Sequence, residues 1–152
     1  MNAPKLVTIL IVMVSFVLLF AVSVSAQEVK TVTVAGILEK AKCPLTEEQA
    51  KKLKEFKPGG DRSGFRAVYE LFDEKQTTAL KEALGSSPGR NGGPERPRNL
   101  FFTVIFENSG CPFTEDQITK MKELPTGKEG FEKMREVFTE KQNAIMDEMF
   151  NR

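Results

Sequence analysis

The chain is built from two copies of one segment. The sequence CPLTEEQAKKLKEF at positions 43–56 returns as CPFTEDQITKMKEL at positions 111–124, with eight of the 14 aligned residues identical. The sequence FRAVYELFDEKQTTALKEAL at 65–84 returns as FEKMREVFTEKQNAIMDEMF at 131–150, with seven of 20 identical. Most other aligned pairs keep their apolar or polar character. A duplication of this length predicts two units with the same structure.

Apolar residues in the first copy recur at positions i, i+3, i+4 and i+7, which is one face of an α-helix, and the second copy has a similar apolar face. The matched sets are Phe65, Val68, Tyr69 and Phe72 in the first copy, and Phe131, Met134, Val137 and Phe138 in the second. We therefore predict helices over 46–56, 65–84, 114–123 and 128–150. The expected fold is all-α: two tandem helical repeats, each a short helix plus a helical hairpin, related by pseudo-two-fold symmetry.

An apolar stretch precedes each copy, at 31–38 and at 100–106. Its β-branched and aromatic residues are typical of strands, whereas the rest of each copy is helical. Both alternatives stay open, but the two stretches should share one structure. Between the copies, residues 85–99 are rich in Gly, Pro, Ser and Arg, which predicts an exposed, flexible linker.

The N-terminus predicts export. Lys5 precedes an apolar run, and Val24-Ser25-Ala26 supplies the small residues of a cleavage site before Gln27. We expect residues 1–26 to be a signal peptide; the alternative is a retained N-terminal anchor, because the run approaches the length of a membrane span. The chain then divides into the signal peptide 1–26, the first repeat 27–84, the linker 85–99 and the second repeat 100–152. A periplasmic or secreted location follows.

Composition excludes several functions. The chain has no His, so it lacks imidazole for a catalytic triad, a metal site or a pH switch. Beyond the signal peptide, basic and acidic residues balance, so we expect no binding to nucleic acid and no membrane contact beyond the signal peptide or anchor. We expect no catalytic residues, no cofactor and no metal ligands.

Cys43 and Cys111 occupy matching positions in the two copies. Two cysteines in an oxidising compartment usually pair, and equivalent positions near a pseudo-two-fold axis would meet. We therefore predict a Cys43–Cys111 disulfide. The alternatives are two buried thiols or an intermolecular bridge.

One short motif occurs four times: an apolar residue, Thr or Asp, two charged residues, then Gln. This order predicts a capping box, in which the Thr or Asp side chain accepts from the N3 amide and the N3 Gln accepts from the N-cap amide. The motif residues are Leu45, Thr46, Gln49; Phe72, Asp73, Gln76; Phe113, Thr114, Gln117; and Phe138, Thr139, Gln142.

Gln76 lies on the same stripe as Phe65, Phe72 and Ala79, so one straight helix over 65–84 would bury its amide in an apolar seam. A new helix that starts at Asp73 instead makes Gln76 a capping residue. The same holds for Thr139 and Gln142. We predict a break near 72–73 and near 138–139.

Repeated L-T-x-x-Q motifs behind a signal peptide resemble the LTxxQ family, the Spy/CpxP-type periplasmic proteins of bacteria. Leu45, Thr46 and Gln49 match the motif fully; the other three copies have Phe for Leu, and the second has Asp for Thr. The resemblance implies an all-α periplasmic protein that acts as an ATP-independent chaperone or as an accessory inhibitor of envelope-stress sensor kinases. Those proteins are typically one helical hairpin with two motifs that dimerises into a cradle. This chain would mimic the dimer by duplication.

The favoured function is thus an exported helical binding protein, chaperone-like or an envelope-stress accessory factor, whose partners are unfolded or partner proteins. Its abundant Phe and Met residues would supply a client-binding face if the core does not use them all. The alternative is a structural or interaction module without chaperone activity. An enzyme lacks an assembled nucleophile, and a metal sensor would have only two thiols as soft ligands.

Overall fold

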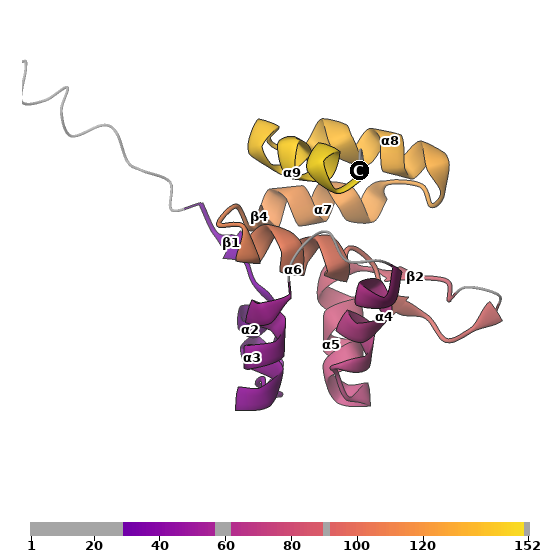
Figure 1. Cartoon of the computed structure of the whole chain (residues 1–152). Helices are drawn as coiled ribbons and strands as arrows, with labels where there is room; N and C mark the ends of the chain where they lie inside the picture. The colour runs from indigo at the N-terminus through magenta and orange to yellow at the C-terminus, as the bar shows by residue number, and fades with distance from the viewer. Residues whose placement is uncertain (1–28, 57–61, 90–91, 151–152) are drawn as a thin grey trace, which may run out of the picture.

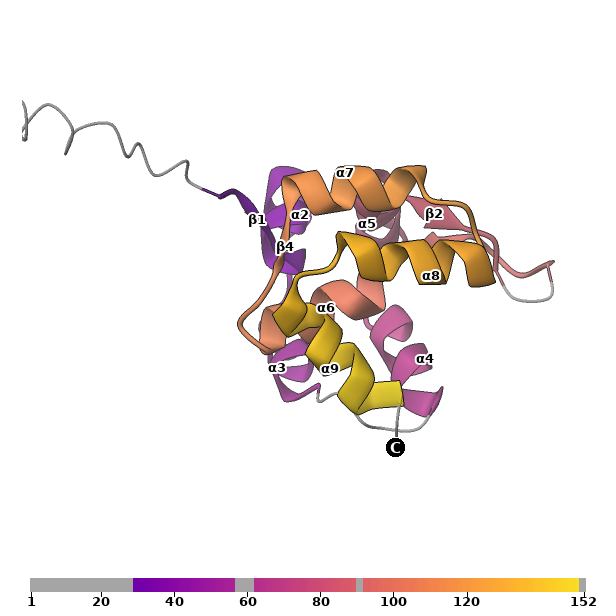
Figure 2. The ribbon, with the colours of Figure 1, turned by 90° about the horizontal axis from the view of Figure 1, so that it is seen from above.

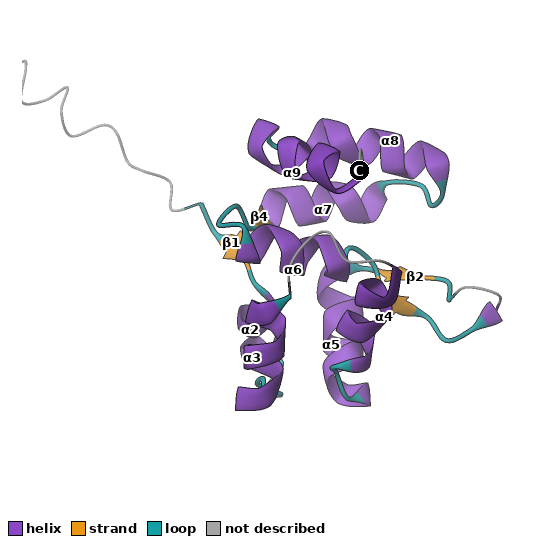
Figure 3. Ribbon diagram, in the orientation of Figure 1, coloured by secondary structure: helices purple, strands orange, loops and turns teal. Residues whose placement is uncertain are grey.

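The computed structural model describes residues 29–56, 62–89 and 92–150 (Figure 1). Most of these residues are helical, and the strands among them are two residues long (Figure 3). The predicted all-α class is therefore confirmed. The predicted signal peptide, 1–26, lies outside the described residues. Within the described ranges, no helix is long and apolar enough to cross a membrane.

Each repeat contributes four described helices in the same order. In the first repeat these are α2 (Val34–Lys40), α3 (Glu47–Glu55), α4 (Arg62–Glu70) and α5 (Glu74–Leu84). In the second they are α6 (Leu100–Asn108), α7 (Glu115–Glu123), α8 (Lys128–Val137) and α9 (Glu140–Phe150). The open choice between strand and helix for the apolar stretches is resolved as helix, since α2 and α6 cover most of both.

Two short antiparallel strand pairs join segments that are distant in sequence. β1 (Thr31–Val32) pairs with β4 (Phe113–Thr114), with Thr31 opposite Thr114 and Val32 opposite Phe113. β2 (Ser86–Ser87) pairs with β3 (Arg96–Pro97) inside the linker. The β1–β4 pair thus connects the start of the first repeat with the first capping motif of the second repeat.

Helix α6 is the centre of the molecule. It lies between the group α2–α5 and the layer formed by α7, α8 and α9 (Figures 1 and 2). Its sequence is apolar on nearly every side, which predicts a helix buried all round, and six of its nine residues are buried. Phe106 is fully enclosed and contacts the rings of Phe113 and Phe138 edge-on, with centroids 5.0 and 5.1 Å away. Burial of such aromatic side chains supplies much of the stability of a small domain.

The two repeats share a core through α6. The ring of Phe101 stacks on Phe65 of α4 with a centroid distance of 3.4 Å. At the end of α6, the Asn108 side-chain amide donates to the Leu53 and Phe56 carbonyls, at 2.7 and 2.9 Å. Asn108 thereby supplies donors to carbonyls at the C-terminus of α3, where the Leu53 carbonyl also accepts from the Phe56 amide at 3.3 Å.

Helices α2 and α6 end in the same way. Lys42 and Gly110 adopt left-handed backbone conformations, with φ of 56° and 68°. The amide of the next residue, Cys43 or Cys111, donates back to the Leu38 or Phe106 carbonyl at 2.9 Å. This is the Schellman arrangement, which places an apolar residue directly after the left-handed position.

The Lys42→Gly substitution is expected to raise the free energy of unfolding by about 0.5–1 kcal/mol, because glycine adopts the left-handed conformation without the strain that other residues pay. The Lys42 side chain is exposed, so little packing is lost. Chemical denaturation measures the change. The reciprocal Gly110→Lys substitution should destabilise, and equal stabilities for wild type and both variants would contradict the prediction.

The linker is more ordered than its composition predicts. Pro97 and Asn99 are buried, and the Arg98 amide donates to the Gly85 carbonyl at 2.7 Å. The Arg98 guanidinium donates to the carbonyls of Leu124 and Pro125, both at 2.7 Å. The expectation of an exposed linker is therefore wrong for its last residues, because a β-hairpin and an arginine anchor them to the helices.

Candidate functional site

All four motifs are capping boxes. The hydroxyl of Thr46 and the carboxylate of Asp73 accept from the Gln49 and Gln76 amides at 3.2 and 2.8 Å. The hydroxyls of Thr114 and Thr139 accept from the Gln117 and Gln142 amides at 3.1 and 3.2 Å. In each motif the Gln Oε1 atom also accepts from the backbone amide of the capping residue. The predicted capping role of these twelve motif residues is thus confirmed for its polar members.

The predicted helix breaks are also present. Helix α4 ends at Glu70 and α5 begins at Glu74, while α8 ends at Val137 and α9 begins at Glu140. The apolar residue before each cap packs toward the core, as the staple arrangement requires. Phe113 and Phe138 are buried, whereas Leu45 and Phe72 are partly buried against the same core.

The motifs of each repeat join in pairs through their glutamines. The Gln49 Nε2 atom donates to Gln76 Oε1 at 2.8 Å, and the Gln76 Nε2 atom donates to Gln49 Oε1 at 3.1 Å. In the second repeat Gln117 Nε2 donates to Gln142 Oε1 at 2.8 Å. Each glutamine therefore caps its own helix and holds the helix of the partner motif.

Backbone carbonyls accept the remaining glutamine protons. Gln49 and Gln117 donate to the Leu71 and Val137 carbonyls at 2.7 and 2.9 Å, in the bends before α5 and α9. Gln142 donates to the Cys111 carbonyl at 2.9 Å, and Gln76 donates to the carbonyls of Cys43 and Pro44. Sequence reasoning assigned each Gln to its own cap and missed this pairing. The signal available in the sequence was that a capping glutamine uses only its Oε1 atom, so its Nε2 protons need other acceptors.

The structure corrects the predicted disulfide: Cys43 and Cys111 are free cysteines. Each follows the left-handed residue that ends its helix, and each backbone is held by the Gln of its own repeat. Their matching positions thus reflect a repeated helix ending, in which an apolar residue is favoured, and not a bridge between repeats. Burial raises the pKa of the Cys111 thiol, with Lys141 opposing this, so the thiolate is disfavoured.

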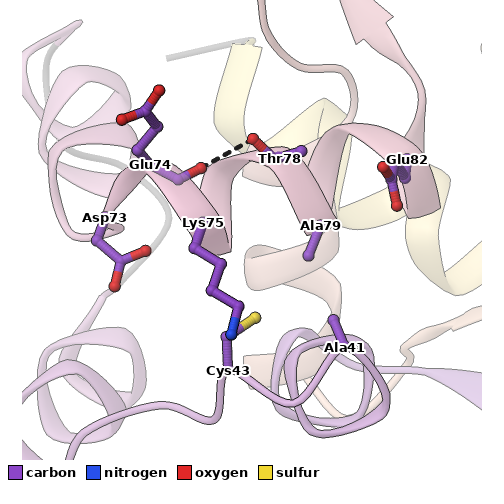
Figure 4. Close-up of a pocket in the computed structure, with 8 residues that line it drawn as sticks. All are labelled: Ala41, Cys43, Asp73, Glu74, Lys75, Thr78, Ala79 and Glu82. Atoms are coloured by element: carbon purple, nitrogen blue, oxygen red, sulfur yellow. Dashed lines mark hydrogen bonds between the residues drawn. The ribbon is translucent and has the colours of Figure 1, made fainter.

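A surface groove lies where α2, α5 and α7 meet. One end is lined by Cys43, by Asp73 at the N-cap of α5 and by α5 residues including Glu74, Lys75 and Thr78 (Figure 4). The other end is lined by β1 and by α7 residues including Glu115, Ile118 and Lys122. The two ends share Ala41, Ala79 and Glu82, so we treat them as one feature, the interhelical groove. Figure 4 shows Ala79 pointing toward Ala41 across it.

The floor of the interhelical groove is apolar and made mostly of small side chains, whereas its rim is charged. The floor residues are Val32, Gly36, Ile37, Ala41, Ala79, Ala83 and Ile118. On the rim, Lys40 pairs with Glu115 at 3.7 Å, and the Lys122 Nζ atom donates to the Glu82 carbonyl at 2.8 Å. Such a surface suits a polypeptide segment better than a compact polar metabolite, which needs several converging polar groups.

Among the described residues, no group of three or more His, Cys, Asp or Glu side chains is placed to hold a metal ion. Comparison of the chain with protein-family models, with curated proteins and with solved structures finds no match.

A half-buried carboxylate links the repeats close to this region. Glu107 Oε2 of α6 accepts from the Val34 amide at the N-terminus of α2, at 3.0 Å. Burial raises the pKa of Glu107, and the Val34 hydrogen bond only partly offsets this. A carboxylate with a raised pKa in the folded state binds its proton more tightly when folded. Its contribution to stability therefore falls as the pH rises from the unfolded pKa through the folded one.

The Glu107→Gln variant is expected to have a higher free energy of unfolding than the wild type at pH 7. The neutral amide oxygen of Gln still accepts from the Val34 amide, and no charge is buried. The difference should close as the pH falls to about 3, below the ordinary Glu pKa of about 4.3, where Glu107 is protonated in both states. Urea denaturation between about pH 3 and 8 measures it. Glu39, the exposed equivalent in the first repeat, provides the control Glu39→Gln. A wild type that loses stability on acidification relative to Glu107→Gln would contradict the assignment.

Proposed function

We propose that the protein is an exported helical binding protein, periplasmic or secreted, that holds extended segments of unfolded or partner proteins. Its activity is chaperone-like or that of an envelope-stress accessory factor. The observation that carries this proposal is the interhelical groove, which is apolar at its floor, charged at its rim and open along its length.

Small side chains on the floor support this function. Gly36, Ala41, Ala79 and Ala83 leave space into which the side chains of a bound segment fit, and they demand no particular shape. The rim carries both signs of charge, which keeps the unoccupied protein soluble without selecting one sequence. A groove of this kind fits many extended segments with modest affinity.

We further infer that the chain is a duplicated member of the LTxxQ type, with its two repeats related by pseudo-two-fold symmetry. Support comes from the matched order of helices, from the left-handed residues Lys42 and Gly110, and from a glutamine pair in each repeat. On this proposal the four motifs build the scaffold, and the groove between repeats takes the place of the cradle that two subunits would form.

A second candidate is a structural or interaction module without chaperone activity. The described surface favours it in one respect, because the large apolar side chains that it leaves exposed are few: Val29, Phe65, Phe131 and Phe150. A chaperone that offers a broad apolar surface would expose more of them.

The test is suppression of aggregation of a denatured model client by the protein expressed from its full-length sequence and recovered after export. The blocking variant is Ala83→Arg, which places a long charged side chain in the groove from the last turn of α5. The matched control is Ala144→Arg on the exposed face of α9, outside the groove.

We expect the wild type and Ala144→Arg to suppress aggregation at stoichiometric ratios and Ala83→Arg to lose the effect, with unchanged circular dichroism and thermal unfolding for all three. If Ala83→Arg still suppresses aggregation, the client binds outside the groove. An inactive wild type would favour the structural module.

A further inference from the structure

We propose that the interhelical groove takes its partner as an added β-strand: an extended segment pairs with the free edge of β1 and sets a basic side chain beside Glu82. This inference rests on the proposed binding function and specifies the chemistry of the bound segment.

The outer edge of β1 has unpaired backbone groups. Hydrogen-bonded and non-hydrogen-bonded pairs alternate along an antiparallel ladder. The Glu115 amide donates to the Lys30 carbonyl at 3.1 Å, and Val32 lies opposite Phe113. These are the hydrogen-bonded pairs, so the N–H and C=O groups of Thr31 point away from β4. The Thr114 amide is already used by the Gln117 side chain, which agrees with this alternation.

That free edge borders the interhelical groove, because Thr31, Val32 and Thr33 line it together with α5 and α7. The sheet has two strands among the described residues, so β1 is an edge strand that no further strand covers. A polypeptide in extended form carries N–H and C=O groups at the spacing that such an edge requires, which is the basis of recognition by strand addition. The edge therefore selects an extended chain over a helix as the occupant.

Carboxylates slightly outnumber ammonium groups around the groove: Asp73, Glu74, Glu82 and Glu115 against Lys40, Lys75 and Lys122. Lys40 is paired with Glu115, whereas Lys75 and Lys122 keep their charge and donate to the Lys42 and Glu82 carbonyls. Within the described part of the chain, the Glu82 carboxylate has neither an ion pair nor a hydrogen bond, and it borders both ends of the groove. Charge complementarity then favours a lysine or arginine on the bound segment.

The probe is a blocked heptapeptide of alternating threonine and valine with a central lysine, titrated into the exported protein and followed by amide chemical shifts. The key variant is Thr31→Pro, which removes the outward N–H group while Lys30 keeps its hydrogen bond from Glu115 and Val32 its pairing with Phe113. Proline is tolerated at edge strands for this reason. A second variant is Glu82→Lys, with Glu123→Lys, at the exposed end of α7, as its control.

We expect the peptide to shift amides of β1 and α5, and Thr31→Pro to weaken its binding about tenfold, which corresponds to the loss of one good hydrogen bond. Glu82→Lys should weaken binding of the lysine peptide and strengthen binding of the same peptide with a central glutamate, whereas Glu123→Lys should change neither.

Binding of both peptides that is unaffected by Thr31→Pro and Glu82→Lys would overturn strand addition. If client protection is still lost in Ala83→Arg, the proposed binding function would stand without strand addition. A peptide that shifts only amides outside the groove would also overturn the inference. A wild type that neither binds the peptide nor protects the client would overturn the inference and the proposed function together.

Discussion

Replacing Gln142 by alanine is expected to lower the free energy of unfolding by about 3 kcal/mol, because each buried polar group left without a partner costs about 1–3 kcal/mol. Gln142 is 1% exposed and makes three side-chain hydrogen bonds. It accepts from the Thr139 amide, accepts from Gln117 and donates to the Cys111 carbonyl. The loss of its side-chain volume in the core adds a cavity term.

Urea denaturation followed by circular dichroism measures the effect, and two variants identify its cause. Gln142→Glu keeps the acceptor for Thr139 but cannot donate to Cys111 and buries a charge, so it should destabilise at neutral pH and recover in acid. Gln49→Ala alters the more exposed member of the first pair and should cost less. A double-mutant cycle between Gln117 and Gln142 isolates the pair itself. A loss below about 0.5 kcal/mol, which is typical of surface substitutions, would show that the glutamine pair does not hold the helices together.

The sequence predicted the parts of this fold that depend on local interactions. The helices follow from apolar residues at helical spacing. The breaks at Asp73 and Thr139 follow from Gln76 and Gln142, whose amides an unbroken helix would have buried without partners. Capping boxes are also local, since the residues that form them lie three positions apart. Each of these features could be derived without knowledge of which helices are neighbours.

The features that depend on packing between helices could not be derived in this way. The pairing of Gln49 with Gln76 requires that the N-termini of α3 and α5 meet, and no local pattern specifies this. Export and symmetry together suggested that Cys43 and Cys111 would bridge, whereas the repeated helix ending accounts for an apolar residue at both positions. The interhelical groove is formed by three helices from two repeats. The sequence did not predict the groove, because the alanines on its floor are equally compatible with an ordinary packed helix face.

The prediction of an exposed linker was wrong for a related reason. Composition describes the solvent exposure of an average segment, but a single side chain can anchor a segment of any composition. Arg98 does so by donating to two carbonyls in the bend between α7 and α8. The anchored bend then restricts the residue that can occupy the first turn of α8, which is Gly130.

Replacing Gly130 by alanine is expected to lower the free energy of unfolding by about 2–3 kcal/mol, which is the usual cost of forcing an extra group into a packed site. Alanine is otherwise favoured over glycine in a helix by about 1 kcal/mol, so the sign of the effect is itself informative. A Cβ atom at Gly130 would collide with the backbone carbonyl of Pro125. That carbonyl cannot turn aside without losing its 2.7 Å hydrogen bond from Arg98.

The first repeat supplies the matched control, because Gly64 of α4 aligns with Gly130. Among the described residues, a Cβ atom at Gly64 would meet the ring of Phe56, at 3.3 Å, and a ring can shift where a backbone carbonyl cannot. Gly64→Ala is therefore expected to leave stability unchanged or raise it by a few tenths of a kcal/mol, since helix propensity and a small steric cost oppose each other. Combining Arg98→Ala with Gly130→Ala should cost less than the sum of the two single changes, because the freed carbonyl can then move. If Gly130→Ala stabilises the protein as much as Gly64→Ala does, the bend between α7 and α8 is not held against α8, and the role assigned to Arg98 fails with it.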